Sequence, residues 1–333
     1  MAGTRFDAVR LGVIGMGNFG RLHALTAAGI AEAELVALVA RRQASLDAVK
    51  DQLPAVRGWL DLEQAMAESN AEAWVVASST ASHVPITTRL LKAGYPVLLE
   101  KPIADSLDEA SGLESLVKPD SSNLMLGHIL LFGSEMLQIM DETRQRGPLT
   151  YISCVRFRPT TTMQLLPGES PFHLTMVHDL YAVLALVQRA EPVKFSAQVH
   201  RTDGGEIDLA LAQLQWESGL IASFAASFLT PPGMAPDGFD RMEVFGRVWA
   251  ARVNANPRPV EVWDEKAQWP MALEIRADPG GPTGMLAEEL RCFARVVRAE
   301  QTVPVGATYH DAMQVQRWLD KLEACATGAQ RKS

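Results

Sequence analysis

The stretch that decides the fold of this chain is VRLGVIGMGNFG, residues 9–20. A short apolar run leads into three glycines with G-x-G-x-x-G spacing, and a helical pattern follows. In this spacing the first glycine makes a tight turn, the second lets the backbone approach a pyrophosphate, and the third lets the helix pack closely on the strand. The stretch predicts a dinucleotide-binding βαβ unit; the alternative is a glycine turn that is only structural. The residues expected to contact the cofactor here are Gly15, Met16, Gly17, Asn18, Phe19 and Gly20.

Apolar runs alternate with helical patterns through the first third of the chain. The predicted strands are Arg10–Ile14, Glu34–Val39, Ala73–Ala77, Pro96–Leu99 and Asn123–Gly127. Continuous apolar strands separated by helices are typical of a parallel sheet covered on both faces. The sequence therefore predicts an α/β fold that begins with a doubly wound parallel sheet of the Rossmann type.

The texture of the sequence changes after Gly147-Pro148, where runs of strand character follow one another with turns between them. The predicted strands are Tyr151–Arg158, Val193–His200, Ile207–Trp216, Leu220–Phe228, Met242–Phe245, Val248–Val253 and Pro259–Trp263, with a helix over Phe172–Gln188. This pattern predicts an α+β domain with a large, mostly antiparallel sheet. We expect a cofactor domain over residues 1–125 and a substrate and oligomerisation domain over 126–333, with the last helices packing back on one of them.

Composition limits the partners of the chain. It has 333 residues, a formal charge of -8 and 47% hydrophobic residues, which suits two globular domains. The acidic balance provides no electrostatic footprint for nucleic acid or an anionic membrane, and no apolar run approaches the ~20 residues of a membrane span. Three widely spaced cysteines predict neither a disulfide framework nor a zinc site. We expect a cytoplasmic protein without nucleic-acid or membrane partners.

The end of the second strand decides which dinucleotide is favoured. A site for NAD places a carboxylate about 20 residues beyond the glycines, where it binds the ribose 2′-hydroxyl. Here the sequence is Ala40-Arg41-Arg42, with no carboxylate and two guanidiniums. Guanidinium geometry suits a 2′-phosphate, so NADP is favoured over NAD. The alternative is that both arginines belong to an ordinary solvated turn.

A charged pair ends another apolar strand, in Pro96-Val97-Leu98-Leu99-Glu100-Lys101-Pro102. The carboxyl edge of an open α/β sheet is where ligands bind. A lysine there can exchange the proton that accompanies hydride transfer. Glu100 can orient Lys101 or contact the cofactor ribose, and Pro102 fixes the turn.

Together, the glycine loop, the strand-end Glu-Lys-Pro and the strand-rich second domain resemble the glucose–fructose oxidoreductase, inositol dehydrogenase and MocA family (Gfo/Idh/MocA). The resemblance covers most of the chain and is strongest over residues 9–133. It implies a dehydrogenase or reductase that transfers hydride between NAD(P) and a hydroxyl or carbonyl of a sugar, polyol or sugar derivative. Lys101 then corresponds to the acid/base lysine of the family. A homodimer or homotetramer is also implied.

The resemblance also marks cofactor-lining residues after the strand Ala73–Ala77. They are Ser78, Ser79, Thr80 and His83, together with Glu100, Lys101 and Pro102. The alternative for His83 is a helix N-terminal residue without a ligand. His128 resembles a family position on the strand that leaves the cofactor domain, and the alternative for it is a satisfied core histidine.

A second catalytic element is implied within the helix Phe172–Gln188. The family usually carries an Asp and a His four residues apart; His178 matches the histidine, but Leu174 occupies the Asp position. His178 can still act with Lys101, His173 can substitute for the missing Asp, or catalysis is altered or lost. The last possibility predicts a dinucleotide-sensing regulatory protein on the same scaffold. Arg156 and Arg158 share one strand face, either as a solvated face or as an anchor for an anionic substrate.

Overall fold

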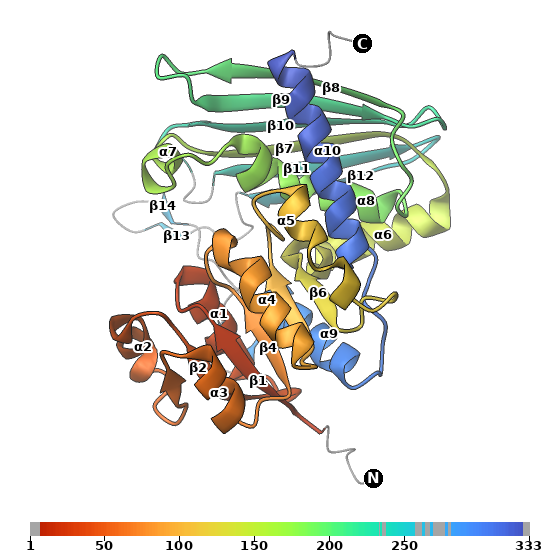
Figure 1. Ribbon diagram of the computed structural model, residues 1–333. Coiled ribbons are helices and arrows are strands. Elements are labelled where there is room, and N and C mark those ends of the chain that lie inside the picture. Colours follow the sequence, from red (N-terminus) through yellow and green to blue (C-terminus); the bar gives the residue numbers. More distant parts are fainter. Residues whose placement is uncertain are drawn as a thin grey trace. The chain divides into compact units, whose positions relative to one another are not determined.

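The computed structural model describes residues 7–232, 234, 238–256, 262–263, 267–268, 277–278 and 281–328. The chain forms two compact units (Figure 1). The first unit comprises Met1–Gly133 and Ala272–Met313, and the second comprises Ser134–Met271 and Gln314–Ser333. The chain therefore leaves the first unit, builds most of the second, returns to the first and ends in the second.

The first unit contains a six-stranded sheet in the order β3-β2-β1-β4-β5-β6. Its strands are β1 (Val9–Ile14), β2 (Ala33–Val39), β3 (Gly58–Trp59), β4 (Ala73–Val76), β5 (Val97–Glu100) and β6 (Leu124–Gly127). Every neighbouring pair is parallel. The strand order reverses between β1 and β4, which is the switch point where doubly wound sheets bind dinucleotides. The predicted Rossmann sheet is confirmed.

Helices connect these strands because apolar strands such as β4 and β5, which are buried throughout, need cover on both faces. They are α1 (Asn18–Ala27), α2 (Gln43–Lys50), α3 (Leu62–Glu68), η1 (Thr80–Ser82), α4 (His83–Lys92), α5 (Leu107–Ser111), η2 (Glu114–Leu116) and η3 (Ile129–Phe132). The returning segment adds α9 (Met285–Val297), which packs against α1 and η3.

The returning segment is also bonded to the edge of the parallel sheet. The Leu126 amide donates to the Ala307 carbonyl over 2.8 Å, and the Tyr309 amide donates to Ser121 Oγ over 2.9 Å. The division that the sequence placed after residue 125 lies within β6, whereas the compact units divide after Gly133. The extra residues include η3, whose side chains Ile129, Leu131 and Phe132 are buried.

The second unit contains a six-stranded sheet in the order β12-β11-β7-β10-β9-β8. Its strands are β7 (Leu149–Pro159), β8 (Lys194–Arg201), β9 (Ile207–Gln215), β10 (Ile221–Thr230), β11 (Phe239–Gly246) and β12 (Ala250–Asn256). Only the central β7–β10 pair is parallel. The predicted mostly antiparallel sheet is confirmed.

Helices cover one face of this sheet. They are α6 (Ser134–Arg146), α7 (Thr161–Leu165), the π-helical η4 (Phe172–Met176), α8 (Val177–Leu186) and α10 (Tyr309–Thr327). Trp318 of α10 meets Trp216 edge to face, with ring centroids 6.0 Å apart. The helix predicted over Phe172–Gln188 is present in two parts, the π-helical η4 followed directly by α8.

Four two-residue strands complete the described elements: β13 (Val262–Trp263), β14 (Ala267–Gln268), β15 (Ala277–Asp278) and β16 (Gly281–Pro282). The strand predicted over Pro259–Trp263 lies mostly outside the described residues. Among the helices that the structure describes, none is both long and apolar enough to cross a membrane.

The other face of the second sheet carries partly exposed apolar side chains. Tyr151, Ile221 and Phe245 are neighbours in register on β7, β10 and β11. Their exposed fractions are 38%, 37% and 36%, and that of Leu211 on β9 is 42%. Tyr151 also bonds to Ser223 Oγ over 2.6 Å. We call this surface the open sheet face.

Candidate functional site

The glycine loop has the geometry that its sequence predicts. Gly15 has a φ of +96°, and a Cβ on it would collide with the backbone of Ala77, where the loop passes β4. A Cβ on Gly20 would overlap the Gly15 carbonyl, so only glycine lets α1 begin so close to β1. At Gly17, by contrast, no atom lies within 4 Å of the Cβ position. The loop therefore has the tight turn at Gly15, the close helix–strand packing at Gly20 and the open space at Gly17 that its sequence predicts.

The helix that follows has a free N-terminus of the kind that binds anions. Gly17 is the N-cap of α1, no side chain caps it, and the first turn carries no acidic residue. The amides around Asn18 and Phe19 therefore retain their capacity to bind a phosphate. These features fit a dinucleotide pyrophosphate.

Two arginine side chains that follow β2 are exposed to solvent. Ala40 is buried, while Arg41 and Arg42 are exposed. Neither guanidinium forms an ion pair with any residue that the structure describes. They are available to a negatively charged group at the carboxyl edge of the sheet.

Hydrogen bonds to other protein groups fix the segment that follows β4. Ser82 Oγ donates to Ser78 Oγ over 2.8 Å, and it also lies 3.2 Å from Ser79 Oγ, which orders the turn that contains Thr80. His83 is buried, with Nδ1 2.8 Å from the Pro102 carbonyl and Nε2 3.1 Å from the Ser78 carbonyl. Both ring nitrogens of His83 thus contact backbone carbonyls, and the ring ties this turn to the Glu-Lys-Pro turn.

Glu100 is the centre of the Glu-Lys-Pro turn. One carboxylate oxygen, Oε1, lies 2.7 Å from His23 Nε2 of α1, and Oε2 accepts the Lys101 amide over 3.2 Å. The Lys101–Pro102 peptide bond is cis. Gly127 of β6 lies so close that a Cβ there would be 2.7 Å from Glu100 Oε1. Glu100 therefore binds protein groups on both oxygens and orients the backbone that carries Lys101.

His128 is fully buried close to this turn. Burial lowers the pKa of His128 well below its ordinary value, and the charge of Lys101 lowers it further. His128 is therefore neutral at physiological pH, which places an uncharged ring beside the Lys101 ammonium.

In the second unit, His178 lies at the start of α8, directly before a buried ion cluster. The Asp179 carboxylate accepts two hydrogen bonds from Arg156, from Nη2 over 2.9 Å and from Nε over 3.2 Å. Arg156 also forms an ion pair with Asp240 at 3.1 Å. Burial alone would lower the pKa of Arg156, but the two carboxylates raise it above its ordinary value, so this arginine is charged. The cluster fixes the start of α8 to β7 and β11.

The predicted solvated strand face is therefore wrong for Arg156, which is 7% exposed. Arg158 is half-buried and binds Asp240 with both terminal nitrogens, at 2.6 and 3.0 Å. The helices cover this face, and Asp179 and Asp240 supply the counter-charge that permits burial. Both arginines are held by protein carboxylates.

His173 is held by another helix. Its Nε2 lies 3.1 Å from Glu323 Oε1 of α10. Burial lowers the pKa of His173, but the bond and charge of Glu323 outweigh this, so the pKa is raised overall. Leu174, which the resemblance predicts to stand at the position of the family Asp, is half-buried.

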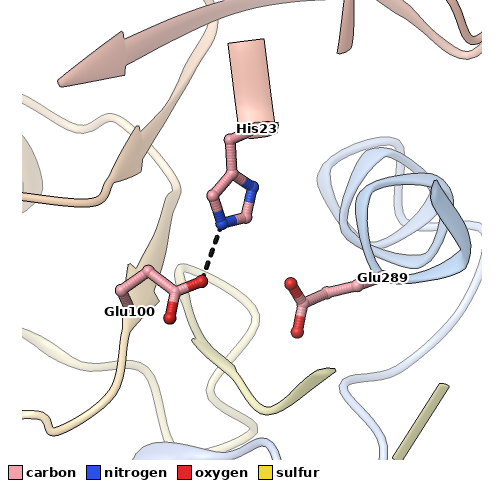
Figure 2. A group of neighbouring side chains, drawn as sticks. All are labelled: His23, Glu100 and Glu289. Carbon is pink, nitrogen blue, oxygen red and sulfur yellow. Dashed lines mark hydrogen bonds and ion pairs between the residues drawn. The ribbon is translucent and has the colours of Figure 1, made fainter. Parts of the chain in front are cut away.

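Two members of the site region were not singled out from the sequence. His23 is buried at the contact between α1 and Glu100, and Glu289 of α9 lies close to both. Figure 2 shows the three side chains converging from separate segments. The signal for His23 was its polar side chain on the otherwise apolar face of a predicted helix. No local sequence signal marked Glu289, because only the tertiary fold brings it close to His23 and Glu100.

The fold, the glycine loop and the strand-end residues define a nicotinamide dinucleotide-binding oxidoreductase. Residues 9–128 match the family described as "Oxidoreductase family, NAD-binding Rossmann fold" (GFO_IDH_MocA). This match covers the parallel sheet of the first unit, and the chain is also similar over more of its length to proteins named as dehydrogenases.

Two relatives and one solved structure illustrate the similarity. The chain is 29% identical over 221 residues to UDP-N-acetylglucosamine 3-dehydrogenase of Acidithiobacillus ferrooxidans, covering 66% of this chain and 67% of that protein. It is 25% identical over 266 residues to inositol 2-dehydrogenase of Rhizobium meliloti, covering 76% and 78%. Its fold is similar to that of scyllo-inositol dehydrogenase from Lactobacillus casei with bound NAD(H) and scyllo-inositol, with a TM-score of 0.80, 20% identity and coverage of 97% and 98%.

The buried ion cluster generates a stability prediction. Replacing Asp179 with alanine leaves the charge of Arg156 only partly compensated in a buried site, so we expect a loss of about 3 kcal/mol of unfolding free energy. Urea denaturation followed by circular dichroism measures this. The matched control is Asp203→Ala on an exposed turn, expected to change stability by less than about 0.5 kcal/mol. Equal effects of the two substitutions would show that the cluster does not stabilise the start of α8.

Proposed function

We propose that this protein is an NADP-preferring dehydrogenase that transfers hydride to or from a hydroxyl-bearing carbon of a sugar, polyol or sugar derivative, with Lys101 as the acid/base. The observation that carries the proposal is the Glu100-Lys101-Pro102 turn. It follows a strand of the same parallel sheet as the glycine loop, and buried His23 and His83 hold it in place.

The cofactor would be held by three parts of the first unit. The amides after Gly17 bind its pyrophosphate, the turn over Ser78–Thr80 lines its nicotinamide half, and Arg41 with Arg42 binds a 2′-phosphate. When bound, the nicotinamide supplies the hydride acceptor or donor. The protein's own task is then to orient the substrate and move one proton.

Lys101 is suited to moving that proton. An alcohol that loses hydride must also lose its hydroxyl proton, and the reverse reduction must regain it. Glu100 has both oxygens on His23 and the Lys101 amide, so it fixes the backbone from which the lysine extends. We assign the substrate-side hydrogen bond to His178.

The substrate class is supported by the relatives. Those named above act on an inositol or on UDP-N-acetylglucosamine, both of which present secondary hydroxyls on a ring. The two relatives are named for different ring compounds. We therefore propose the class and not the individual compound.

A second candidate function rests on Leu174. A leucine cannot replace the carboxylate of the family Asp, and His173 beside it is bound to Glu323. This combination favours a dinucleotide-sensing protein that has lost turnover. The retained Glu-Lys-Pro turn argues for the enzyme.

The first prediction concerns Lys101. Lys101→Met should lower kcat by at least about 100-fold, because it removes a general acid/base, while NADPH binding measured by fluorescence persists. Turnover is followed by nicotinamide absorbance across a panel of inositols, sugars and UDP-sugars. The control is Lys92→Met on the exposed end of α4. Binding of NADPH by the wild type without turnover of any panel compound would support the sensor instead.

Cofactor choice gives a separate prediction. The double substitution Arg41→Ala/Arg42→Ala should reduce the affinity for NADPH relative to NADH by at least about tenfold, since an exposed charged hydrogen bond contributes roughly 1.4 kcal/mol. Titration of both cofactors by fluorescence measures the ratio. Arg89→Ala, another exposed arginine, should leave it unchanged. A ratio unaffected by the double substitution would contradict the assignment of the 2′-phosphate to these residues.

We also propose that the open sheet face is covered by a second copy of the chain. Its four apolar residues are partly exposed on a broad sheet, and symmetric homo-oligomers are the usual way to bury such a face. Leu211→Glu/Ile221→Glu should convert a dimer or tetramer into a smaller species in light scattering coupled to gel filtration. Leu60→Glu, at an exposed leucine of the first unit, is the control. A monomeric wild type would refute the proposal.

A further inference from the structure

A buried carboxyl group on the returning segment has no evident partner. Glu289 of α9 is 0% exposed, and neither of its side-chain oxygens has a hydrogen bond to any described residue. One of its oxygens lies within 4.8 Å of both a ring nitrogen of His23 and a carboxylate oxygen of Glu100. Figure 2 shows its carboxyl group directed toward that pair. Two acidic groups thus face each other inside the first unit.

The charge state of this cluster follows from its hydrogen bonds. Glu100 accepts from two donors, which suits an ionised carboxylate. Within the described part of the chain, Nδ1 of His23 has no hydrogen-bond partner, so the ring reaches this cluster through its Nε2 contact with Glu100. Among the described residues, no lysine or arginine forms a hydrogen bond with the Glu289 carboxyl group. Two ionised carboxylates at this separation in a buried site would repel strongly.

We propose that Glu289 is a neutral carboxylic acid at physiological pH, and that its proton keeps Glu100 in place beneath Lys101. Glu100 then carries the negative charge, in contact with His23 Nε2 and the Lys101 amide, and Glu289 adds no second one. Glu289 is accordingly a positioning residue: its loss of the proton would push the Glu100 carboxylate away from His23 and from the Lys101 amide. The part of this inference that concerns Lys101 rests on the proposed function.

The groups around Glu289 agree with this assignment. Burial raises the pKa of Glu289 well above its ordinary value, and the charge of Glu100 raises it further. Helix α1 has two titratable residues: Arg21 is bound to Gln52, and His23 is the one that faces Glu289. The charged residue of β2, Glu34, is exposed, and η3 contributes apolar side chains. On α9 itself, burial and then Glu289 raise the pKa of Cys292 to about 12, so this thiol is neutral.

A metal ion is the competing interpretation of the same three residues. One histidine and two carboxylates could form three ligands of a divalent cation. However, Nε2 of His23 and Oε1 of Glu100 are 2.7 Å apart and hydrogen-bonded, and a cation would have to displace that proton. The bonded geometry favours the proton.

The test is the pH dependence of stability. Because the folded-state pKa of Glu289 lies above the unfolded value near 4.5, the native state binds more protons, and stability falls as pH rises above that value. Glu289→Gln mimics the protonated acid. The unfolding equilibrium constant of the wild type should therefore rise by about tenfold more per pH unit than that of the variant, until Glu289 ionises in the folded state. Urea denaturation from pH 5 to 9 gives both curves.

Two further variants and one spectrum complete the design. Glu289→Met, which removes the carboxyl group and keeps its volume, should show the same shallow pH dependence. Glu288→Gln, on the neighbouring residue that pairs with Arg291, should keep the wild-type slope. Infrared difference spectra between wild type and Glu289→Gln should contain the carbonyl stretch of a carboxylic acid, shifted in D2O.

Three results would overturn the proposal. They are equal pH slopes for wild type and Glu289→Gln, failure of both Glu289 variants to fold, and one equivalent of tightly bound divalent metal that Glu289→Gln loses. Activity adds an independent readout: kcat of Glu289→Gln should persist at alkaline pH where that of the wild type falls with its stability. Absence of turnover in the wild type would contradict the proposed function, while the slopes and the infrared band still decide the charge of Glu289.

Discussion

The hydrogen bond between His23 and Glu100 is the constraint on which the candidate site depends. It joins the helix that follows the glycine loop to the turn that carries Lys101, two segments 77 residues apart in the sequence. Phe19, one of the loop residues, stacks edge to face on the His23 ring at 5.2 Å, so the loop and the turn share one buried contact. The glycine loop and the Glu-Lys-Pro turn of the first unit are thereby held in one geometry.

Much of the fold could be predicted because it depends on local patterns. The spacing of the loop glycines indicates a conformational or packing role for each of Gly15, Gly17 and Gly20. The continuous apolar strands predict a sheet covered on both faces. The succession of strand-like runs separated by turns likewise predicted the second sheet. These features need only neighbours in the sequence to be recognised.

The environment of the site could not be predicted to the same depth, because it depends on contacts between distant segments. Arg156 read as part of a solvated face until α8 and β11 brought Asp179 and Asp240 against it. Glu289 sits in an amphipathic helix pattern, and only the return of the chain to the first unit buries it beside Glu100. His83 was assigned to the cofactor from the resemblance, whereas its nitrogens lie on two backbone carbonyls.

The central claim is that the first unit presents Lys101 to the reacting carbon of a bound nicotinamide and substrate. A crystal structure of the protein with NADPH and an inositol tests this most directly. The account predicts a pyrophosphate on the amides after Gly17, a 2′-phosphate at Arg41 and Arg42, and Lys101 Nζ within hydrogen-bond distance of the hydroxyl on the carbon that faces nicotinamide C4. A nicotinamide bound with Lys101 directed away from it, toward protein carboxylates alone, would contradict the account.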